Sequence, residues 1–255
     1  MDLGGKVIVV TGGGSGIGAA MARRFADEGP SALVVADLDG AAAEQVASEV
    51  SCAAIEVDVS DEVENARLVD AVETRYGPID LFCANAGIGF PGDEQSPAET
   101  WDRMWRVNVL SHIFAAKQLI PGWVERGDGY FLSTASAAGL LTNLKAAEYS
   151  VTKHAAVAFS EWLAVTYGDL GVKVSCLCPQ GVRTPLMEGS GEFRKLLEPV
   201  ALEPEEVADA VVEGLATERF LILPHPEVAG YFLNKATDYD RWIAGMRRLQ
   251  DRVFD

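Results

Sequence analysis

The sequence predicts an α/β fold, in which helices cover both faces of a doubly wound, parallel sheet of about seven strands. Short apolar runs alternate with amphipathic helical segments along the 255 residues. The first run, residues 6–11 (KVIVVT), is apolar almost throughout, as is typical of a strand buried on both faces. A glycine-rich segment then leads into the first helix. No linker, repeat or low-complexity stretch divides the chain, so we expect one domain over residues 1–255.

The elements follow one another in regular alternation. Apolar runs predict strands over residues 6–11, 32–37, 53–59, 80–85, 130–133, 172–178 and 220–223. Helical spacing of apolar residues predicts helices over 16–28, 41–50, 61–76, 97–123 (interrupted near Pro121), 148–168 and 204–217. Glycine followed by proline at 29–30 and 77–78 ends the first and third of these helices.

Composition excludes several classes of partner. The formal net charge of −17 repels nucleic acid and anionic membrane surfaces, so we expect neither as a partner. The sequence shows no signal peptide and no apolar run long enough to span a membrane, which predicts a cytoplasmic protein. Cys176 and Cys178 are too close for a zinc knuckle, and the three histidines are not paired at ligand spacing. We therefore expect no metal site.

The glycine segment predicts a dinucleotide site. Gly12, Gly16 and Gly18 lie between an apolar strand and an amphipathic helix, where the backbone can cradle a pyrophosphate. Asp37 ends the second strand, where a carboxylate can bind both ribose hydroxyls of adenosine and repel a 2′-phosphate. No Arg or Lys lies near it in the sequence, so we expect NAD rather than NADP. Asp37 could instead cap a helix or serve a turn, and Asp39 is the rival carboxylate.

Three residues predict acid/base chemistry on an alcohol. Tyr149 and Lys153 are four apart and share one face of a helix, so the ammonium can lower the phenol's pKa from its usual value near ~10. Ser136, at the exit of the fifth strand, can hydrogen-bond the substrate oxygen. Ser133 is expected within that strand. Taken singly, these residues could be a surface phenol, a solvated charge and a loop hydroxyl. Together with the glycine segment they favour an oxidoreductase that interconverts an alcohol and a ketone.

In this order the motifs resemble the short-chain dehydrogenase/reductase family over residues 1–190. The segment 11–18 is similar to that family's T-G-x-x-x-G-x-G loop, and Ser136, Tyr149 and Lys153 fit its S-x12-Y-x3-K spacing. The resemblance implies a Rossmann-type fold and a homodimer or homotetramer. It implies that Asn108 completes a proton relay by holding a water next to Lys153. The cofactor contacts it implies are Gly12, Ser15, Gly16, Ile17, Gly18, Asp58, Val59, Asn85, Ala86, Gly87, Tyr149, Lys153, Pro179, Val182 and Thr184.

The sequence departs from the family pattern after the sixth strand. Where P-G-x-x-x-T is usual, Gln180 stands in the glycine position, which puts a backbone with φ > 0 there in doubt. Gln180 is either merely tolerated or directed toward cofactor or substrate. Loops at the carboxyl ends of strands, with the segment 185–200, are expected to line the substrate pocket. The side chains expected in this pocket are mostly apolar and favour an apolar substrate, although Phe90 and Met187 could equally be packing residues. The expected pocket residues are Ile88, Phe90, Leu140, Leu141, Gln180, Leu186 and Met187.

The end of the chain is also unusual for the family. Residues 227–253 predict a helical tail that carries several aromatic side chains. So much aromatic surface must be buried, either over the chain's own pocket or against another subunit. Two other functions remain open at this point: a non-catalytic NAD-binding regulatory or scaffold protein, and an epimerase or dehydratase that holds NAD tightly.

Overall fold

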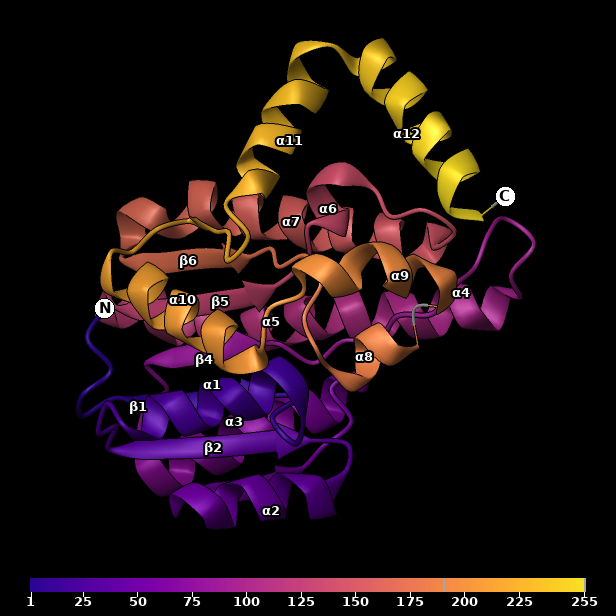
Figure 1. Ribbon diagram of the computed structural model, residues 1–255. Helices are drawn as coiled ribbons and strands as arrows, with labels where there is room; N and C mark the ends of the chain where they lie inside the picture. The colour runs from indigo at the N-terminus through magenta and orange to yellow at the C-terminus, as the bar shows by residue number, and fades with distance from the viewer. Residues whose placement is uncertain (190, 255) are drawn as a thin grey trace.

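The computed structural model describes residues 1–189 and 191–254, and its centre is a parallel sheet (Figure 1). Within this part of the chain the strand order is β3-β2-β1-β4-β5-β6-β7, and every neighbouring pair is parallel. The predicted doubly wound sheet is confirmed. The strands are β1 (Val7–Thr11), β2 (Ala32–Asp37), β3 (Ala53–Glu56), β4 (Leu81–Ala84), β5 (Gly129–Thr134), β6 (Val172–Leu177) and β7 (Leu221–Ile222).

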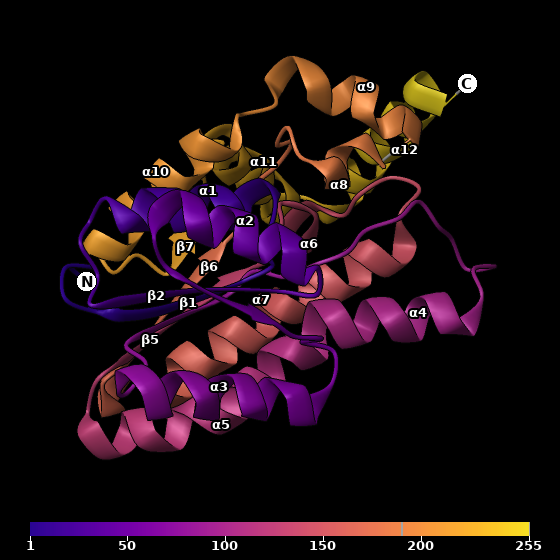
Figure 2. The same cartoon turned by 90° about the horizontal axis from the view of Figure 1, so that it is seen from below.

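Helices form a layer on each face of the sheet, as Figure 2 shows. One layer holds α1 (Gly16–Ala26), α2 (Gly40–Val50) and α10 (Pro204–Ala216). The other holds α3 (Glu62–Tyr76), α4 (Ala98–Trp105), α5 (Ser111–Arg126) and α7 (Ala147–Tyr167). The short helices α6 (Ala138–Leu141), α8 (Pro185–Glu188) and α9 (Arg194–Leu197) lie beyond the strand ends, and α11 (Glu227–Thr237) and α12 (Tyr239–Phe254) complete the chain.

The sheet divides the hydrophobic core into two halves. On one face Val10 and Val35 pack against Met21 of α1 and Val211 of α10. On the other face, side chains of β1, β4 and β5 pack against α3, α5 and α7. Because both faces are buried, the strands consist of apolar runs rather than alternating patterns.

The predicted helix over 97–123 is wrong in its interior. A π-helical turn, Arg106–Leu110, separates α4 from α5, and Pro121 lies inside α5 without ending it. Proline removes the backbone donor that would bond the Lys117 carbonyl, but Lys117 and Pro121 are both exposed, so the missing hydrogen bond lies on the solvent side of α5. The third strand also ends earlier than predicted, at Glu56, because residues 57–59 leave the sheet and line the cavity described below.

The predicted single helical tail is two helices. Asp238 adopts an extended conformation between α11 and α12, and its carboxylate accepts a hydrogen bond from the Arg241 amide. An aspartate in this position caps the following helix, so α12 begins in a new direction. Figure 1 shows α11 rising away from the body and α12 turning back toward it. None of the helices described is both long and apolar enough to cross a bilayer.

Candidate active site

A cavity of about 1390 Å³ runs along the carboxyl ends of the strands. The loops that follow β1, β2, β4, β5 and β6 line it, together with α8, α11 and α12. In open α/β sheets this edge is where ligands bind. Its volume exceeds the roughly 300–1,000 Å³ that is usual for one small ligand. All the residues assigned to cofactor contacts from the sequence line this cavity.

The start of α1 is suited to an anion. Its N-cap residue Ser15 makes no side-chain cap hydrogen bond, and the first turn contains no acidic residue. The first backbone N–H groups therefore have no carboxylate or hydroxyl partner from the cap, and the helix dipole adds positive potential there. Gly18 is a steric requirement of this turn, since a Cβ would lie 2.0 Å from the carbonyl oxygen of Gly12.

Asp37 lies at the end of β2 and faces the cavity. Its carboxylate accepts hydrogen bonds from the amides of Gly14 (2.9 Å) and Asp39 (3.0 Å). Asp39 caps α2 by accepting from the Ala42 amide at 3.0 Å, so the helix-cap role considered for Asp37 falls to Asp39. Among the cavity residues that the structure describes, none on β1, β2, β3 or the loops after them is Lys or Arg. A 2′-phosphate would meet a carboxylate here and no cation.

The loops after β1 and β4 are joined by side-chain hydrogen bonds. Asn85 donates its amide to the Thr11 carbonyl at 3.0 Å, and the Asn85 backbone N–H donates to the Thr11 hydroxyl at 3.0 Å. These two strands are neighbours where the strand order reverses, which is the switch point of the sheet. The hydrogen bonds hold the glycine segment against the N-A-G segment, residues 85–87, at that point.

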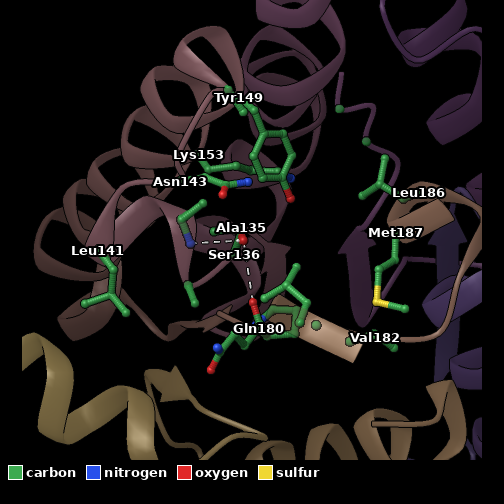
Figure 3. Close-up of a pocket in the computed structure, with 18 of the residues that line it drawn as sticks. Ala135, Ser136, Leu141, Asn143, Tyr149, Lys153, Gln180, Val182, Leu186 and Met187 are labelled. Atoms are coloured by element: carbon green, nitrogen blue, oxygen red, sulfur yellow. Dashed lines mark hydrogen bonds between the residues drawn. The ribbon is translucent and has the colours of Figure 1, made fainter. Parts of the chain in front are cut away.

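Ser136, Tyr149 and Lys153 face the same cavity (Figure 3). Tyr149 and Lys153 come from α7, and the Lys153 ammonium lies 5.7 Å from the centroid of the Tyr149 ring. Lys153 donates a hydrogen bond to the Thr134 carbonyl at 2.9 Å. Ser136 accepts from the Ala138 amide at 3.1 Å, and its hydroxyl donates to the Pro179 carbonyl at 3.5 Å, a long contact that a ligand oxygen could replace. Ser133, the other candidate serine, is buried within β5, as expected.

Burial shifts the pKa of both α7 residues. Burial raises the pKa of the Tyr149 phenol, and its interaction with the Ser136 hydroxyl acts in the opposite direction. Burial lowers the pKa of Lys153 to about 8. The chain on its own therefore favours the neutral phenol. A phenolate near neutral pH requires additional positive charge, such as that of an oxidised nicotinamide.

Asn108 is fully buried in the π-helical turn. Its side chain accepts from the Ile88 amide and donates to the Ile88 carbonyl, both at 2.9 Å, and it also donates to the Thr152 hydroxyl at 3.1 Å. It does not line the cavity but lies close to Lys153. A Cβ on Gly87 would lie 3.3 Å from the Lys153 nitrogen and 3.4 Å from the Asn108 carbonyl oxygen. The two side chains thus approach one point beneath the backbone of Gly87.

Most residues expected at the substrate end line the cavity, among them Ile88, Phe90, Leu186 and Met187. Leu140 does not: it is buried in a hydrophobic cluster with Val157, while its neighbour Leu141 lines the cavity. Adjacent residues on the short helix α6 point in different directions, which explains why Leu141 lines the cavity and Leu140 does not.

Gln180 fits its position without backbone strain. Its φ is not positive, so a glycine is not required there. Its backbone N–H donates to Nδ1 of His225 at 3.1 Å. Figure 3 shows its amide pointing away from Tyr149, and its buried side-chain oxygen has no partner within the described part of the chain.

The sequence left open whether the C-terminal tail would cover its own pocket or meet another subunit, and in the structure α11 and α12 line the cavity. The tail packs over its own pocket on one face, whereas Phe232, Leu233 and Ile243 remain exposed on the other. Helical spacing of arginines in 241–252 was the signal available. The cavity residues contributed by this tail are Tyr231, Asn234, Thr237, Asp238, Arg241, Trp242, Gly245, Met246, Arg248, Leu249, Arg252 and Phe254.

No group of three His, Cys, Asp or Glu suited to a metal ion occurs among the residues described.

Comparisons with known proteins agree with this geometry. Residues 6–195 match the model of the short chain dehydrogenase family. The chain is 33% identical over 236 residues to 1-deoxy-11-beta-hydroxypentalenate dehydrogenase of Streptomyces exfoliatus, covering 89% of this chain and 86% of the relative. It is 35% identical over 223 residues to meso-2,3-butanediol dehydrogenase of Serratia marcescens, covering 84% and 88%. A short chain dehydrogenase/reductase from Burkholderia phymatum, solved in complex with NAD, superposes with a TM-score of 0.87 at 28% identity, covering 94% and 96%.

Proposed function

The chain belongs to the short-chain dehydrogenase/reductase family, and its relatives named above are dehydrogenases. We propose that it interconverts an apolar secondary alcohol and a ketone with NAD as cofactor. One observation carries the proposal: Ser136, Tyr149 and Lys153 face a single cavity whose other end is the glycine segment at the start of α1. The first group can move a proton and the second can bind a pyrophosphate. We treat residues 1–255 as one catalytic domain.

The residues present fit NAD. The uncapped start of α1 would bind the pyrophosphate, and Asp37 would accept hydrogen bonds from the adenosine ribose. Asp58, Val59, Pro179, Val182 and Thr184 line the same cavity and would complete the binding surface. When bound, NAD⁺ supplies the two-electron acceptor that takes a hydride from the alcohol carbon.

The chain's own residues would handle the proton. During oxidation, the alcohol hydroxyl gives its proton to the Tyr149 oxygen while the substrate C–H bond breaks, and a C=O bond forms. Ser136 would donate a hydrogen bond to the reacting oxygen in place of its long contact with the Pro179 carbonyl, while its own oxygen accepts from the Ala138 amide. Lys153 would stabilise the phenolate by its charge and bind the ribose. Asn108 would hold a water beside Lys153, and that water would carry the proton onward. In ketone reduction every transfer runs in reverse.

The proposal is tested with a panel of secondary alcohols and either NAD⁺ or NADP⁺, comparing wild type with Tyr149→Phe. We expect NADH formation by wild type and a loss of about 10²- to 10⁴-fold in kcat for the variant, because positioned proton transfer contributes that much. NADH binding, measured by fluorescence, should persist in the variant. Equal turnover by both proteins would reject Tyr149 as the base, and a preference for NADP⁺ would reject the role of Asp37. Tight NAD binding without turnover on any alcohol would favour a non-catalytic binding protein.

We also propose a cytoplasmic homodimer or homotetramer. The exposed apolar side chains of the tail, Phe232, Leu233, Tyr239 and Ile243, support association. Four free thiols, at Cys52, Cys83, Cys176 and Cys178, support a reducing compartment. Light scattering coupled to size-exclusion chromatography gives the subunit number, and a monomer at micromolar concentration would contradict the oligomer.

A further inference from the structure

One face of α12 forms the outer wall of the cavity and carries three arginines. Arg241, Arg248 and Arg252 line the cavity along with Gly245, a spacing that places all four on one side of a helix. All four arginines of α12 are exposed, but Arg247 does not line the cavity. At the end of this wall, the Lys145 ammonium lies 5.9 Å from the centroid of the Phe254 ring, so the helix returns to the loop that precedes α7.

These cations lack counter-ions in the part of the chain that is described. No ion pair and no side-chain hydrogen bond joins Arg241, Arg248 or Arg252 to another described residue. Lys145 and Arg103 add two further cations to the cavity lining. The carboxylates that line this end are Glu192 and Asp238, and Asp238 already accepts from a backbone amide. Although the net charge of the protein is −17, the α12 wall of the cavity carries arginines without counter-ions among the described residues.

The arginine wall is remote from the adenosine end of the site. Figure 1 places α12 and α2 at opposite ends of the molecule, and Asp37 lies at the end of β2, which α2 follows in the chain. The start of α1, where the pyrophosphate would lie, adjoins Gly12, Asn85 and Thr184, none of which belongs to α12. The cations therefore have no evident role in binding the cofactor and face the substrate part of the cavity.

Apolar side chains separate the arginines from Tyr149. Phe90, Leu186 and Met187 line the cavity from the loops at the strand ends, and Trp242, Met246 and Leu249 line it from α12 between the arginines. An alcohol with an apolar body could extend from Ser136 and Tyr149 along these side chains. Arg241 and Arg252 are 11 residues apart on the helix, which corresponds to about 17 Å along its axis.

We infer that the substrate carries an anionic group, a carboxylate or a phosphate, at the end of an apolar body that bears the reacting alcohol or ketone, and that the arginine face of α12 binds this anion. Arg248 and Arg252 lie one turn apart and can share it, and Arg241 adds positive charge along the same wall. The inference rests on the proposed function and names its substrate class. Guanidinium groups suit both anions because they donate parallel hydrogen bonds to two oxygens. The unpaired cations also offset, locally, the repulsion that the overall negative charge exerts on an anionic substrate.

A binding experiment tests the inference without requiring turnover. The full-length protein, with and without NADH, is titrated with decanoate, decyl phosphate or neutral 1-decanol, and binding is measured by calorimetry. We expect at least one anion to bind about tenfold or more tightly than 1-decanol, and this preference to disappear in the triple variant Arg241→Ala/Arg248→Ala/Arg252→Ala. The matched variant Arg247→Ala should retain it. Whichever anion binds more tightly identifies the group.

Two results would overturn the inference: wild type binding both anions no better than 1-decanol, or Arg247→Ala losing as much preference as the triple variant. A second arm compares kcat/KM for 11-hydroxydodecanoate and its methyl ester. If the ester is oxidised with Tyr149-dependent turnover but neither arm shows a preference for an anion, the proposed function stands and the inference is rejected. If an anion binds at the arginines but no alcohol is oxidised, the anion site stands and the proposed function is rejected.

Discussion

His112 is a fully buried base whose protonation opposes folding. It lies in α5, with its Nδ1 at 3.0 Å from the Ser133 hydroxyl, and its Nε2 has no partner among the described residues. Burial, reinforced by the charge of Lys153, lowers the pKa of His112 to about 3. An imidazole in the unfolded chain titrates near ~6.5. Between these values the unfolded chain binds a proton that the folded protein excludes, so stability is complete above pH ~6.5 and falls as the pH drops.

We predict that His112 accounts for about 2 kcal/mol of the stability lost between pH 6.5 and pH 5, at about 1.4 kcal/mol per pH unit. His112→Asn keeps a polar group near Ser133 but cannot titrate. Urea unfolding of both proteins at pH 7 and pH 5 provides the measurement. The variant should be less stable overall because of the smaller side chain, yet lose less stability on acidification. An equal loss in the two proteins would contradict the assignment.

For single residues, the sequence allowed a correct prediction of position where that position depends only on spacing along one helix. Tyr149 and Lys153 are four apart on a helix, and their shared face follows from helical geometry alone. The surroundings of Asn108, Leu140 and Gln180 depend on distant segments. Leu140 and Leu141 are equally apolar, and only the packing of α6 against α7 decides which of them faces the cavity. Hydrogen bonds from Asn108 to Ile88 likewise join segments that are separated in the sequence.

Among the elements, α5 and α10 each contain an interior glycine, and their surroundings differ. A Cβ on Gly122 of α5 would meet no atom within 4 Å, whereas a Cβ on Gly214 of α10 would lie 2.4 Å from Cδ1 of Ile222 in β7. We predict that Gly122→Ala stabilises the protein by about 0.5–1 kcal/mol, through better helix propensity. Gly214→Ala should destabilise it by about 1–3 kcal/mol, through overpacking against the sheet.

Thermal unfolding of the two variants beside wild type checks both signs in one experiment. A rise in Tm for Gly122→Ala and a fall for Gly214→Ala are expected. Shifts in the same direction would show that helix propensity, or packing, alone governs both sites. The pair is informative because the chemical change is identical and only the neighbourhood differs.

Element types were predictable because both faces of the sheet are buried and both helix layers are amphipathic, which leaves a local signature in the sequence. The residues at which helices and strands begin and end were less predictable. The π-helical turn at Arg106–Leu110 keeps an apolar pattern that resembles ordinary helix, and nothing in that pattern reveals the extra residue in the turn. The break at Asp238 arises from a capping hydrogen bond to Arg241, three residues ahead. That signal was present in the sequence but lay within a longer helical pattern.

On the scale of the whole molecule, the position of the site follows from the order of the strands. The order reverses between β1 and β4, so the loops after these strands diverge onto opposite faces and leave a crevice. The glycine segment and the N-A-G segment meet there, which is why motifs far apart in the sequence could be assigned to one site. The position of the tail does not follow from this rule, because α11 and α12 lie beyond the last strand and their direction depends on tertiary contacts.

Lys235 anchors that tail to the body of the protein. Although it is a lysine, it is only 6% exposed. Its ammonium donates to the Leu140 carbonyl at 2.6 Å, lies 3.5 Å from Nε2 of His154, and lies 5.5 Å from the centroid of the Tyr239 ring. These contacts join α11 to α6 and α7 and to the start of α12. One buried ammonium thus holds the helices that wall the outer part of the cavity.

We predict that Lys235→Met releases the tail without unfolding the sheet. Methionine preserves an unbranched apolar stem but removes the donor, which leaves the Leu140 carbonyl unpaired in a buried position. Amide hydrogen exchange in residues 239–254 should accelerate by about tenfold or more, corresponding to about 1.4 kcal/mol of local stability, while exchange in the sheet should not change. Lys117→Met, at an exposed ion pair with Glu62 on the opposite face, is the control and should change neither region.

If exchange in α12 is the same in Lys235→Met and wild type, apolar contacts of α11 hold the tail and the ammonium does not. If exchange accelerates in the sheet as well, the tail contributes to the stability of the whole chain rather than forming a separately opening wall of the cavity.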